Sequence, residues 1–296
     1  MVLWRLVAHR PDLIHLHTAS YGSFARKSLL AWLARGWGVP VVIHVHGAEF
    51  HTFFMRSPRV VRAYIRATLN HAGKVVALGE TWACRLAEIA PRASVVVIPN
   101  AVRPELAVEQ PEEGELVRVL FLGQVSDRKG AFALIDAWEQ LRRIAPPGTC
   151  ARLVLAGDGA VDRARALIRD LSLSDEVRVL GWVAPRHIND VLRQAHVLAL
   201  PSRDEGQPMA VLEAMAHGLC VVVSAVGGLP DIVDDSCGVL TPADDVPALA
   251  AALHGVIVDP QRRADLGANA LQRVRERFDV DVVWKKLDAL YEELTR

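Results

Sequence analysis

Two glutamates separated by seven residues are the first candidates for chemistry in this sequence. Glu205 and Glu213 lie within residues 200–223, LPSRDEGQPMAVLEAMAHGLCVVV. Pro208 suits the first position of a helix, which places Glu205 in the preceding loop and Glu213 about two turns later. The apolar neighbours of Glu213 make its carboxylate costly to bury without a partner. Glu213 therefore either faces water or binds a ligand rich in hydroxyl groups.

A second candidate site combines a glycine turn with two basic side chains. In residues 121–130, FLGQVSDRKG, the chain is predicted to leave a strand at Gly123 and to enter a helix after Gly130. Backbone amides at the start of a helix attract anions, and Arg128 and Lys129 lie beside them. The stretch predicts an anion site, with a solvated turn that carries two basic residues as an equal alternative.

Three other glycine-containing stretches carry weaker signals. LAGDGA at 155–160 is a partial dinucleotide-binding motif without its third glycine, and an N-cap role for Asp158 is the favoured alternative. Backbone groups of residues 181–183 could lie at the edge of a ligand cleft. The loop Gly227–Gly228 could approach a phosphate closely or form a plain turn.

Two His-x-His pairs end the first two predicted strands. Alternate strand residues share a face, so His15 points with His17 and His44 with His46. Both pairs could reach one metal ion, but this half offers no third set of ligands at metal-like spacing. We therefore predict hydrogen-bonded histidines and no metal centre. His46 precedes Gly47 in a loop that should face the cleft, which makes it the expected functional member.

These candidates belong to a chain in which short apolar runs alternate with helical stretches. The alternation predicts βαβ units on parallel sheets. One series of strands is predicted at residues 13–16, 40–45, 74–78 and 95–99. A second series is predicted at residues 117–122, 152–156, 177–180, 197–200, 219–223 and 238–240. The helices of the second series are predicted at residues 131–144, 160–171 and 186–194, before three closing helical stretches.

Periodicity lapses between the two series, where residues 103–116 carry two prolines and five glutamates. We predict an N-terminal domain over residues 1–104, a linker over 105–116 and a C-terminal domain over 117–278. A final helix over 279–296 is expected to cross back to the first domain. The carboxyl ends of the strands in two such domains should line a ligand cleft.

A stretch rich in arginine, residues 53–69, has an amphipathic pattern. Arg56, Arg59, Arg62 and Arg66 recur at intervals of three and four residues, with apolar residues largely on another face. Such a helix can lie on an anionic membrane. The favoured alternative is an outer helix that packs its apolar side on a sheet. Pro58 is predicted to mark the start of the helix.

Composition excludes several classes of protein. The formal net charge is zero, which disfavours an electrostatic nucleic-acid binder. A mean hydropathy of +0.21 leaves peripheral membrane contact open, but no apolar run approaches the roughly 18 residues of a membrane span. The four scattered cysteines indicate a reduced, cytoplasmic protein. The sequence also lacks the motifs of serine hydrolases, P-loop NTPases and zinc proteases.

Taken together, these stretches resemble the retaining nucleotide-sugar glycosyltransferases of the GT-B fold, in particular glycosyltransferase family 4. Glu205 and Glu213 match the family's Glu-x7-Glu element. The segments FLG…RKG, GDGA, VRVLGWV and GGLPDIV follow in family order, and PDLIHLH and VPVVIHVHG are similar to strands of the family's N-terminal domain. The resemblance covers nearly the whole chain and implies an α/β fold with two Rossmann-like domains facing across a cleft.

The resemblance implies transfer of a sugar from a UDP- or GDP-sugar to a glycan or lipid-linked acceptor, with retention at the anomeric carbon and no metal or other cofactor. It assigns Lys129 to the diphosphate, Glu213 to the ribose hydroxyls and Glu205 to the donor sugar. It places His46 at the sugar or the leaving group. The other implied donor-binding positions are Gly123, Gln124, Arg128, Gly157, Gly181, Trp182, Val183, Gln207, Pro208 and Met209.

Two departures from the family pattern affect the expected activity. Family members usually carry arginine after the glycine at position 123, whereas this chain has Gln124, and Arg128 is the candidate to supply that charge. No strand and glycine-rich loop precede Leu13, so the N-terminal, acceptor-side domain is predicted to be truncated. A non-catalytic nucleotide-sugar-binding protein or partner subunit is therefore an alternative, and a GT-B epimerase is disfavoured by the Glu-x7-Glu match.

Overall fold

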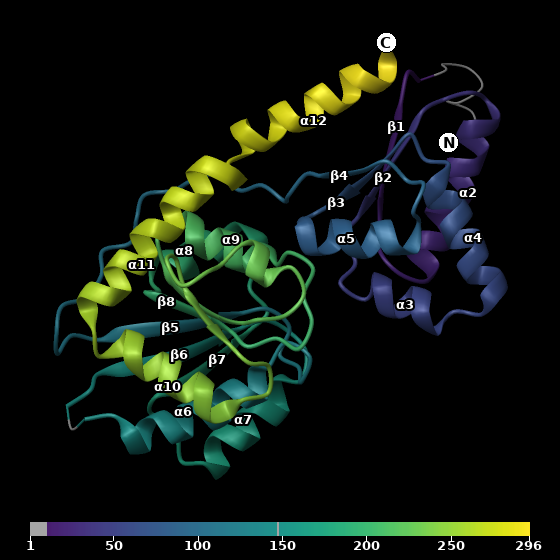
Figure 1. Cartoon of the computed structure of the whole chain (residues 1–296). Coiled ribbons are helices and arrows are strands. Elements are labelled where there is room, and N and C mark those ends of the chain that lie inside the picture. The colour runs from purple at the N-terminus through teal and green to yellow at the C-terminus, as the bar shows by residue number, and fades with distance from the viewer. Residues whose placement is uncertain (1–10, 147) are drawn as a thin grey trace. The chain divides into compact units, whose positions relative to one another are not determined.

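The protein folds into two α/β units in a computed structural model, which describes residues 11–146 and 148–296. Unit 1 consists of the chain up to Asn100 together with Asp281–Arg296, and unit 2 is Ala101–Val280 (Figure 1). Each unit contains one parallel sheet, which confirms the predicted fold class. The expected absence of a strand and glycine-rich loop falls largely on residues 1–10, outside the described residues.

The sheet of unit 1 has the strand order β1-β2-β3-β4. Its strands are β1 (Ile14–Thr18), β2 (Val41–Val45), β3 (Lys74–Ala77) and β4 (Val95–Val97). β1 and β2 pair in parallel with His17 opposite His44. Every residue of β2 is buried, as expected for an inner strand covered on both faces.

Five helices accompany this sheet among the described residues. They are α2 (Gly22–Gly36), α3 (Phe50–Arg56), α4 (Arg59–Asn70), α5 (Glu80–Ile89) and the part of α12 (Val280–Thr295) that belongs to unit 1. The end of α12 contacts the sheet through an ion pair of 2.7 Å between Glu293 and Lys74. A core of aromatic and aliphatic side chains, including Phe24, Phe50 and Trp82, lies between the helices and the strands.

The amphipathic stretch at 53–69 is divided between two helices, and Pro58 marks the start of the second, as predicted. The chain leaves α3 at Ser57, and α4 begins after Pro58, whose ring cannot donate a backbone hydrogen bond within a helix. Ile65 and Leu69 are buried, but Val60 is 81% exposed. The predicted apolar face is therefore only partly covered.

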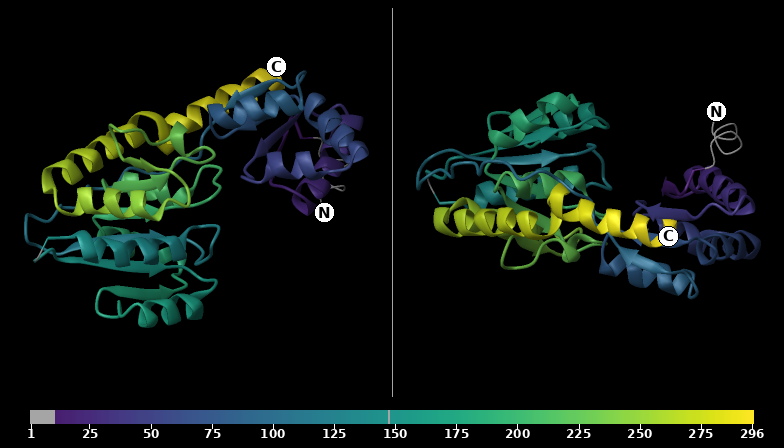
Figure 2. Two further views of the ribbon diagram at one scale, coloured as in Figure 1. Left: turned by 60° about the horizontal axis from the view of Figure 1, so that its bottom comes forward. Right: turned by 90° about the horizontal axis from the view of Figure 1, so that it is seen from above.

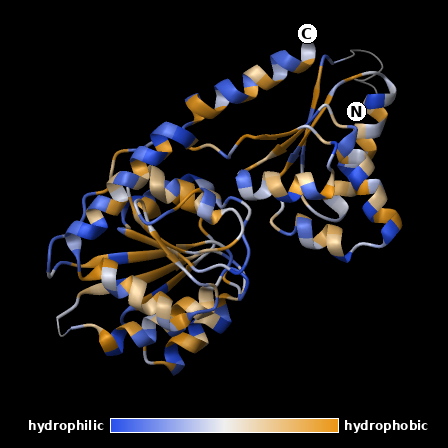
Figure 3. Cartoon of the chain, in the orientation of Figure 1, coloured by the Kyte–Doolittle hydropathy of each residue, from blue (hydrophilic) through white to orange (hydrophobic). Residues whose placement is uncertain are grey.

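The sheet of unit 2 has the strand order β10-β9-β8-β5-β6-β7, and all its pairs are parallel. Its strands are β5 (Val117–Leu122), β6 (Ala151–Ala156), β7 (Val177–Gly181), β8 (Val197–Leu200), β9 (Cys220–Ser224) and β10 (Val239–Thr241). β5, β8 and β9 are almost completely buried. Their continuous apolar runs are typical of parallel strands covered by helices on both faces (Figure 3).

The helices of unit 2 lie on both sides of this sheet (Figures 1 and 2). They are α6 (Ala131–Ile144), α7 (Val161–Asp170), α8 (Ile188–Arg193), α9 (Met209–Ala216), α10 (Val246–Ile257) and α11 (Pro260–Arg273). α6 packs against α7 and α10, whereas α9 packs against α11. The chain moves across the sheet from β5 to β7 in one direction and from β8 to β10 in the other. Because crossovers between parallel strands are almost always right-handed, the helices of the two series lie on opposite faces of the sheet.

The predicted helix at 186–194 is a 3-10 turn, Pro185–His187, followed by the short α8. Residues 105–116, expected to be a linker, contain no helix or strand and belong to unit 2. The backbone amides of Glu105 and Val108 donate to the carbonyls of Ala216 and His217 at 2.9 Å. Among the described residues, no helix is both long enough and apolar enough to traverse a lipid bilayer.

Candidate functional site

The carboxyl ends of β5 and β8 mark the point in unit 2 where the chain order reverses. β6 lies on one side of β5 and β8 on the other, although β8 comes later in the sequence. In open α/β sheets, ligands bind in the crevice at such a switch point. Lys129 lies in the loop after β5 and Glu205 in the loop after β8. The topology therefore brings together two predicted residues that are 76 positions apart.

Lys129 and Glu205 form an ion pair across the switch point. Lys129 Nζ lies 2.5 Å from Glu205 Oε1, and their side chains are 18% and 6% exposed. The hydroxyl of Ser202, which is fully buried, donates to the same carboxylate oxygen at 2.7 Å. A buried carboxylate needs such partners, because its transfer from water is costly. The side chain of Lys129 remains partly exposed to solvent.

Ser202 was not among the predicted site residues. It follows Pro201 directly after β8, and a small hydroxyl residue at a strand end is too common to indicate a site. Its role in the cluster depends on the position of Glu205, three residues later. Only the folded loop shows that the two side chains point toward each other.

Gly227 adopts a left-handed conformation with φ of +54° directly beside Glu205. A Cβ atom at this position would collide with the backbone carbonyl of Glu205, and the amide of Gly228 donates to that carbonyl at 3.2 Å. The predicted Gly227–Gly228 loop therefore packs against the backbone of Glu205 at a distance that only a residue without a Cβ atom permits. This contact fixes the position of the Glu205 loop.

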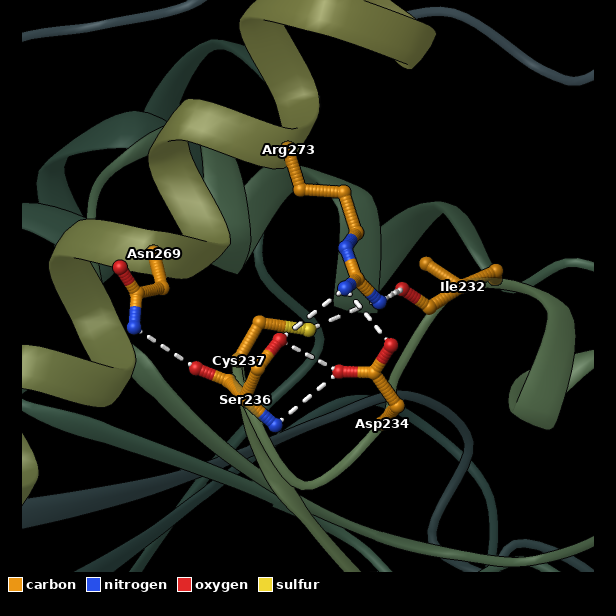
Figure 4. Close-up of polar contacts among 6 residues, drawn as sticks. All are labelled: Ile232, Asp234, Ser236, Cys237, Asn269 and Arg273. Atoms are coloured by element: carbon orange, nitrogen blue, oxygen red, sulfur yellow. Dashed lines mark hydrogen bonds and ion pairs between the residues drawn. The ribbon is translucent and has the colours of Figure 1, made fainter.

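The loop that contains Gly227 is anchored to α11 by a polar network (Figure 4). Arg273 donates to the backbone carbonyl of Ile232 at 3.1 Å and to the carboxylate of Asp234 at 2.7 Å. Hydrogen bonds from Ser236 and the charge of Arg273 lower the pKa of Asp234 to about 2. Asn269 donates to the carbonyl of Ser236 at 2.8 Å, so the loop has several attachments to one rigid helix.

The loops after β5 and β6 meet at another close glycine contact. A Cβ atom at Gly157 would collide with the carbonyl of Gly123, and the amide of Val125 donates to the carbonyl of Asp158 at 2.7 Å. The proposed N-cap role of Asp158 is wrong, because α7 is preceded by Ala160 and has no side-chain cap. Asp158 instead helps to join the two loops through its backbone.

Gln124 and Arg128 are exposed in the loop after β5. The guanidinium group of Arg128 donates to the backbone carbonyl of Asp204 at 3.4 Å, a long hydrogen bond. The backbone amide of Arg203 donates to the carbonyl of Arg128 at 2.9 Å. Arg128 thus lies between the loops after β5 and β8, where its charge adds to that of Lys129.

Glu213 lies on α9 and is partly buried. Burial raises the pKa of its carboxyl group, and no described side chain or amide donates a hydrogen bond to it. The cost of burying the Glu205 carboxylate is offset by a lysine and a hydroxyl group, whereas Glu213 has no such partners among the described residues. A partly buried carboxylate without protein donors is the kind of group that can accept hydrogen bonds from a hydroxyl-rich ligand.

The remaining predicted positions lie at the same end of the sheet. Gln207 is buried, Pro208 is the N-cap of α9, and Met209 is 41% exposed. Gly181 ends β7 with a left-handed φ of +78°, and the following Trp182 is 68% exposed. An exposed indole beside open backbone groups offers a stacking surface for a planar ring.

His46 belongs to a cluster of four histidines in unit 1 that also includes His15, His17 and His44. The rings of His15 and His17 stack with centroids 4.4 Å apart, and those of His44 and His46 are tilted by 33° with centroids 4.1 Å apart. Nδ1 of His17 lies 2.7 Å from Nε2 of His46, and Nδ1 of His15 lies 2.6 Å from the hydroxyl of Tyr291. The expected hydrogen bonds are therefore present for three of the four histidines.

Burial makes these imidazoles hard to protonate. It lowers the pKa of His15 and of His46 to about 4, with the neighbouring histidines adding to the effect. The pKa of His44 falls to about 2 from the same causes, although the backbone at Ile98 acts in the opposite direction. The cluster is therefore neutral at pH 7. Despite the interaction with the Ile98 backbone, neither ring nitrogen of His44 has a partner in hydrogen-bonding geometry among the described residues.

Comparison with known proteins gives the family. Residues 117–259 match the family model of glycosyl transferases group 1, and residues 1–101 match the glycosyl transferase 4-like domain. The chain is 30% identical over 307 residues to the 2-deoxystreptamine N-acetyl-D-glucosaminyltransferase of Streptomyces fradiae, an alignment that covers 94% of this chain and 70% of the relative. The chain belongs to the group 1 glycosyltransferases, glycosyltransferase family 4.

A second relative in this family is the D-inositol 3-phosphate glycosyltransferase of Gordonia bronchialis. It is 30% identical over 288 residues, covering 88% of this chain and 61% of the relative. The chain thus spans 61 to 70% of the length of these two curated relatives.

Solved structures similar to this chain show the GT-B fold. The Anabaena protein HepE in complex with UDP has a TM-score of 0.82 and 22% identity, and the match covers 99% of this chain and 81% of HepE. Sucrose-phosphate synthase from Thermosynechococcus elongatus has a TM-score of 0.81 and 22% identity, with coverage of 99% and 76%. Because these identities are low, they establish the fold and leave the substrates of this chain to be inferred.

Proposed function

We propose that the chain transfers a sugar from a nucleotide-diphosphate sugar to a glycan or lipid-linked acceptor, with retention at the anomeric carbon. The observation that carries this proposal is the Lys129–Glu205 pair at the switch point of the unit 2 sheet. Membership of glycosyltransferase family 4 and the complexes of HepE with UDP and with UDP-glucose support a donor of this class.

The proposed roles follow the chemistry of each side chain. The ammonium group of Lys129 and the amides near the start of α6 stabilise negative charge that develops on the leaving diphosphate. Arg128 adds charge from the same loop and replaces the arginine that family members carry at position 124. Gly123, Gln124 and Gly157 form the loop surface against which the phosphates lie.

The other contacts fix the sugar and the nucleoside. Glu205 and the backbone of Gln207–Met209 bind donor sugar hydroxyls, and Glu213 accepts hydrogen bonds from the ribose. Residues Gly181–Val183 hold the base. His46 contacts the sugar or the leaving group. In the reaction, the bond between the anomeric carbon and the diphosphate oxygen breaks as the bond to the acceptor oxygen forms, and the acceptor hydroxyl gives its proton to the departing diphosphate oxygen.

Substitution of the ion pair tests the donor assignment. Lys129→Met should weaken the binding of UDP or GDP by about 10- to 100-fold, since a hydrogen bond to a charged group contributes about 1.5–3 kcal/mol. Calorimetry on the full chain measures the affinity. Release of nucleoside diphosphate from UDP-glucose, UDP-N-acetylglucosamine or GDP-mannose measures turnover, and both Lys129→Met and Glu205→Gln should abolish it.

Lys74→Met is the matched control, because it removes the lysine from another Lys–Glu pair, in unit 1. It should leave nucleotide affinity unchanged. The double variant Lys129→Met/Glu205→Gln separates fold from function, since it removes both buried charges and should recover stability without recovering binding. Wild-type affinity in Lys129→Met would contradict the diphosphate assignment. Donor binding without nucleoside diphosphate release would instead favour the non-catalytic binding protein.

A further inference from the structure

The histidine cluster of unit 1 contains an arrangement that sugar transfer does not use. His15, His17 and His44 lie on the facing strands β1 and β2, with His17 directly opposite His44 in the register. One ring nitrogen from each lies within 4.8 Å of those of the other two. We propose that these three histidines form a binding site for one divalent transition-metal ion of the zinc class. The site does not depend on the proposed function.

The hydrogen bonds of the cluster leave one nitrogen available on each of two histidines. Nδ1 of His15 is taken by the Tyr291 hydroxyl, and its Nε2 is buried without a partner among the described residues. Nδ1 of His17 is taken by His46, which leaves its Nε2 for a ligand. Metal-binding histidines commonly have their second ring nitrogen held in this way, which fixes the ring and its tautomer.

The burial of the His44 imidazole is the observation that points most directly to a ligand. The side chain of His44 is 6% exposed, and neither buried ring nitrogen meets the geometry of a hydrogen bond among the described residues, although the backbone of Ile98 interacts with the imidazole. An imidazole placed there without partners loses the hydrogen bonds that water would supply. A metal ion bound by His44 together with its two neighbours would satisfy one of these nitrogens.

The donor set indicates the kind of ion. Three imidazoles with no carboxylate or thiolate suit Zn²⁺, Co²⁺, Ni²⁺ and Cu²⁺ better than Mg²⁺ or Ca²⁺, which prefer oxygen ligands. Zn²⁺ binds three histidines and keeps a fourth position for water or another ligand. His17 is exposed, so an ion can reach the cluster from solvent. Coordination requires modest rotation of the stacked rings, because the nitrogens must converge on one point.

Metal titration of the untagged full chain tests the site. Zn²⁺ binding is measured by calorimetry and by competition with a chromogenic chelator, and Co²⁺ binding by its visible absorption. The expected result is one ion per chain, with a Co²⁺ spectrum of nitrogen coordination. His17→Ala should weaken Zn²⁺ binding by at least 10-fold, and its exposed position makes a folding defect a minor concern.

Three other variants complete the test. Tyr291→Phe keeps all three ligands and removes only the bond to His15, so affinity should fall about 10-fold. His44→Gln should abolish the Co²⁺ spectrum, with circular dichroism confirming the fold. His51→Ala removes a histidine on α3 outside the cluster and should change nothing. Absence of saturable binding, or equal affinity in His17→Ala and wild type, would overturn the proposal.

Discussion

Glu205 and Glu213 show how environment separates two carboxylates of identical chemistry. Glu205 is nearly fully buried but has Lys129 and Ser202 as partners. Glu213 is less buried, yet its carboxyl pKa is raised because burial is not compensated. Glu205 is therefore held in place by protein side chains, whereas the carboxylate of Glu213 can accept hydrogen bonds from a ligand.

Glu213→Gln should stabilise the fold and weaken donor binding. The neutral amide avoids the burial of a charge, so the melting temperature should rise. Loss of hydrogen bonds to a charged acceptor should reduce the affinity for UDP or GDP by about tenfold or more. Thermal unfolding and calorimetry measure the two effects.

Glu88→Gln on α5 is the control, because Glu88 is exposed and lies in unit 1. Glu88→Gln should change neither the melting temperature nor the affinity for UDP or GDP. A Glu213→Gln variant with unchanged nucleotide affinity would show that Glu213 faces water in the bound state. That outcome would leave the assignment of Lys129 intact, since the two residues are proposed to bind different parts of the donor.

At the scale of elements, one buried arginine joins the segment 105–116 to two helices, in addition to the backbone hydrogen bonds of Glu105 and Val108. Arg263 on α11 is fully buried and donates to Gln110 Oε1 at 3.0 Å and to the carbonyl of Pro111 at 2.6 Å. It also donates to the carbonyls of Val256 and Ile257 at the end of α10. One guanidinium group thus joins an irregular segment to two helices.

Arg263→Leu should destabilise unit 2 by about 3 kcal/mol or more, because several buried acceptors lose their donor and each costs about 1–3 kcal/mol. Arg263→Lys should recover only part of this loss, since an ammonium group cannot reproduce the planar fork of donors. Urea unfolding gives the free energies. Arg262→Leu, at the exposed neighbouring position, should change stability by less than about 0.5 kcal/mol. Equal losses of stability in Arg262→Leu and Arg263→Leu would contradict the role of the buried Arg263 guanidinium group.

At the scale of the whole molecule, acid sensitivity comes from particular buried groups. The chain carries 34 basic and 34 acidic residues, so net repulsion is absent near neutral pH. His196, just before β8, is buried, and its Nδ1 accepts a hydrogen bond from the amide of Arg118 at 3.0 Å. Burial, with the charges of Arg118 and Arg263, lowers the pKa of His196 to about 4.

The sign of the pH dependence follows from this lowered pKa. The unfolded chain binds a proton at His196 below about pH 6.5, whereas the folded chain resists it down to about pH 4. The stability contribution is therefore complete above pH 6.5 and is lost as the pH falls toward 4, with about 2 kcal/mol lost by pH 5. His196→Asn keeps an acceptor but cannot titrate. Its urea midpoint should fall less steeply between pH 7 and pH 5 than that of wild type, and equal slopes would contradict the assignment.

Local pattern was enough to predict much of the fold. β5 and β8 were predicted at residues 117–122 and 197–200 and are found there, because continuous apolar runs bounded by glycine or proline have few alternatives. α6 agrees with its predicted bounds at residues 131–144 as well. In the amphipathic stretch at 53–69, the predicted helix start at Pro58 is found, but periodicity alone does not show which apolar side chains find a surface to cover them.

The sequence by itself determined the family, the two parallel sheets and the residue types that could bind a nucleotide sugar, because these depend on composition and short motifs. Only the tertiary structure decided which of those residues meet. The Lys129–Glu205 pair, the Gly227 contact, the Arg263 fork and the three histidine nitrogens all join positions far apart in the chain. Strand order and crossover direction bring them together, and no local pattern encodes the distance between two side chains on different strands.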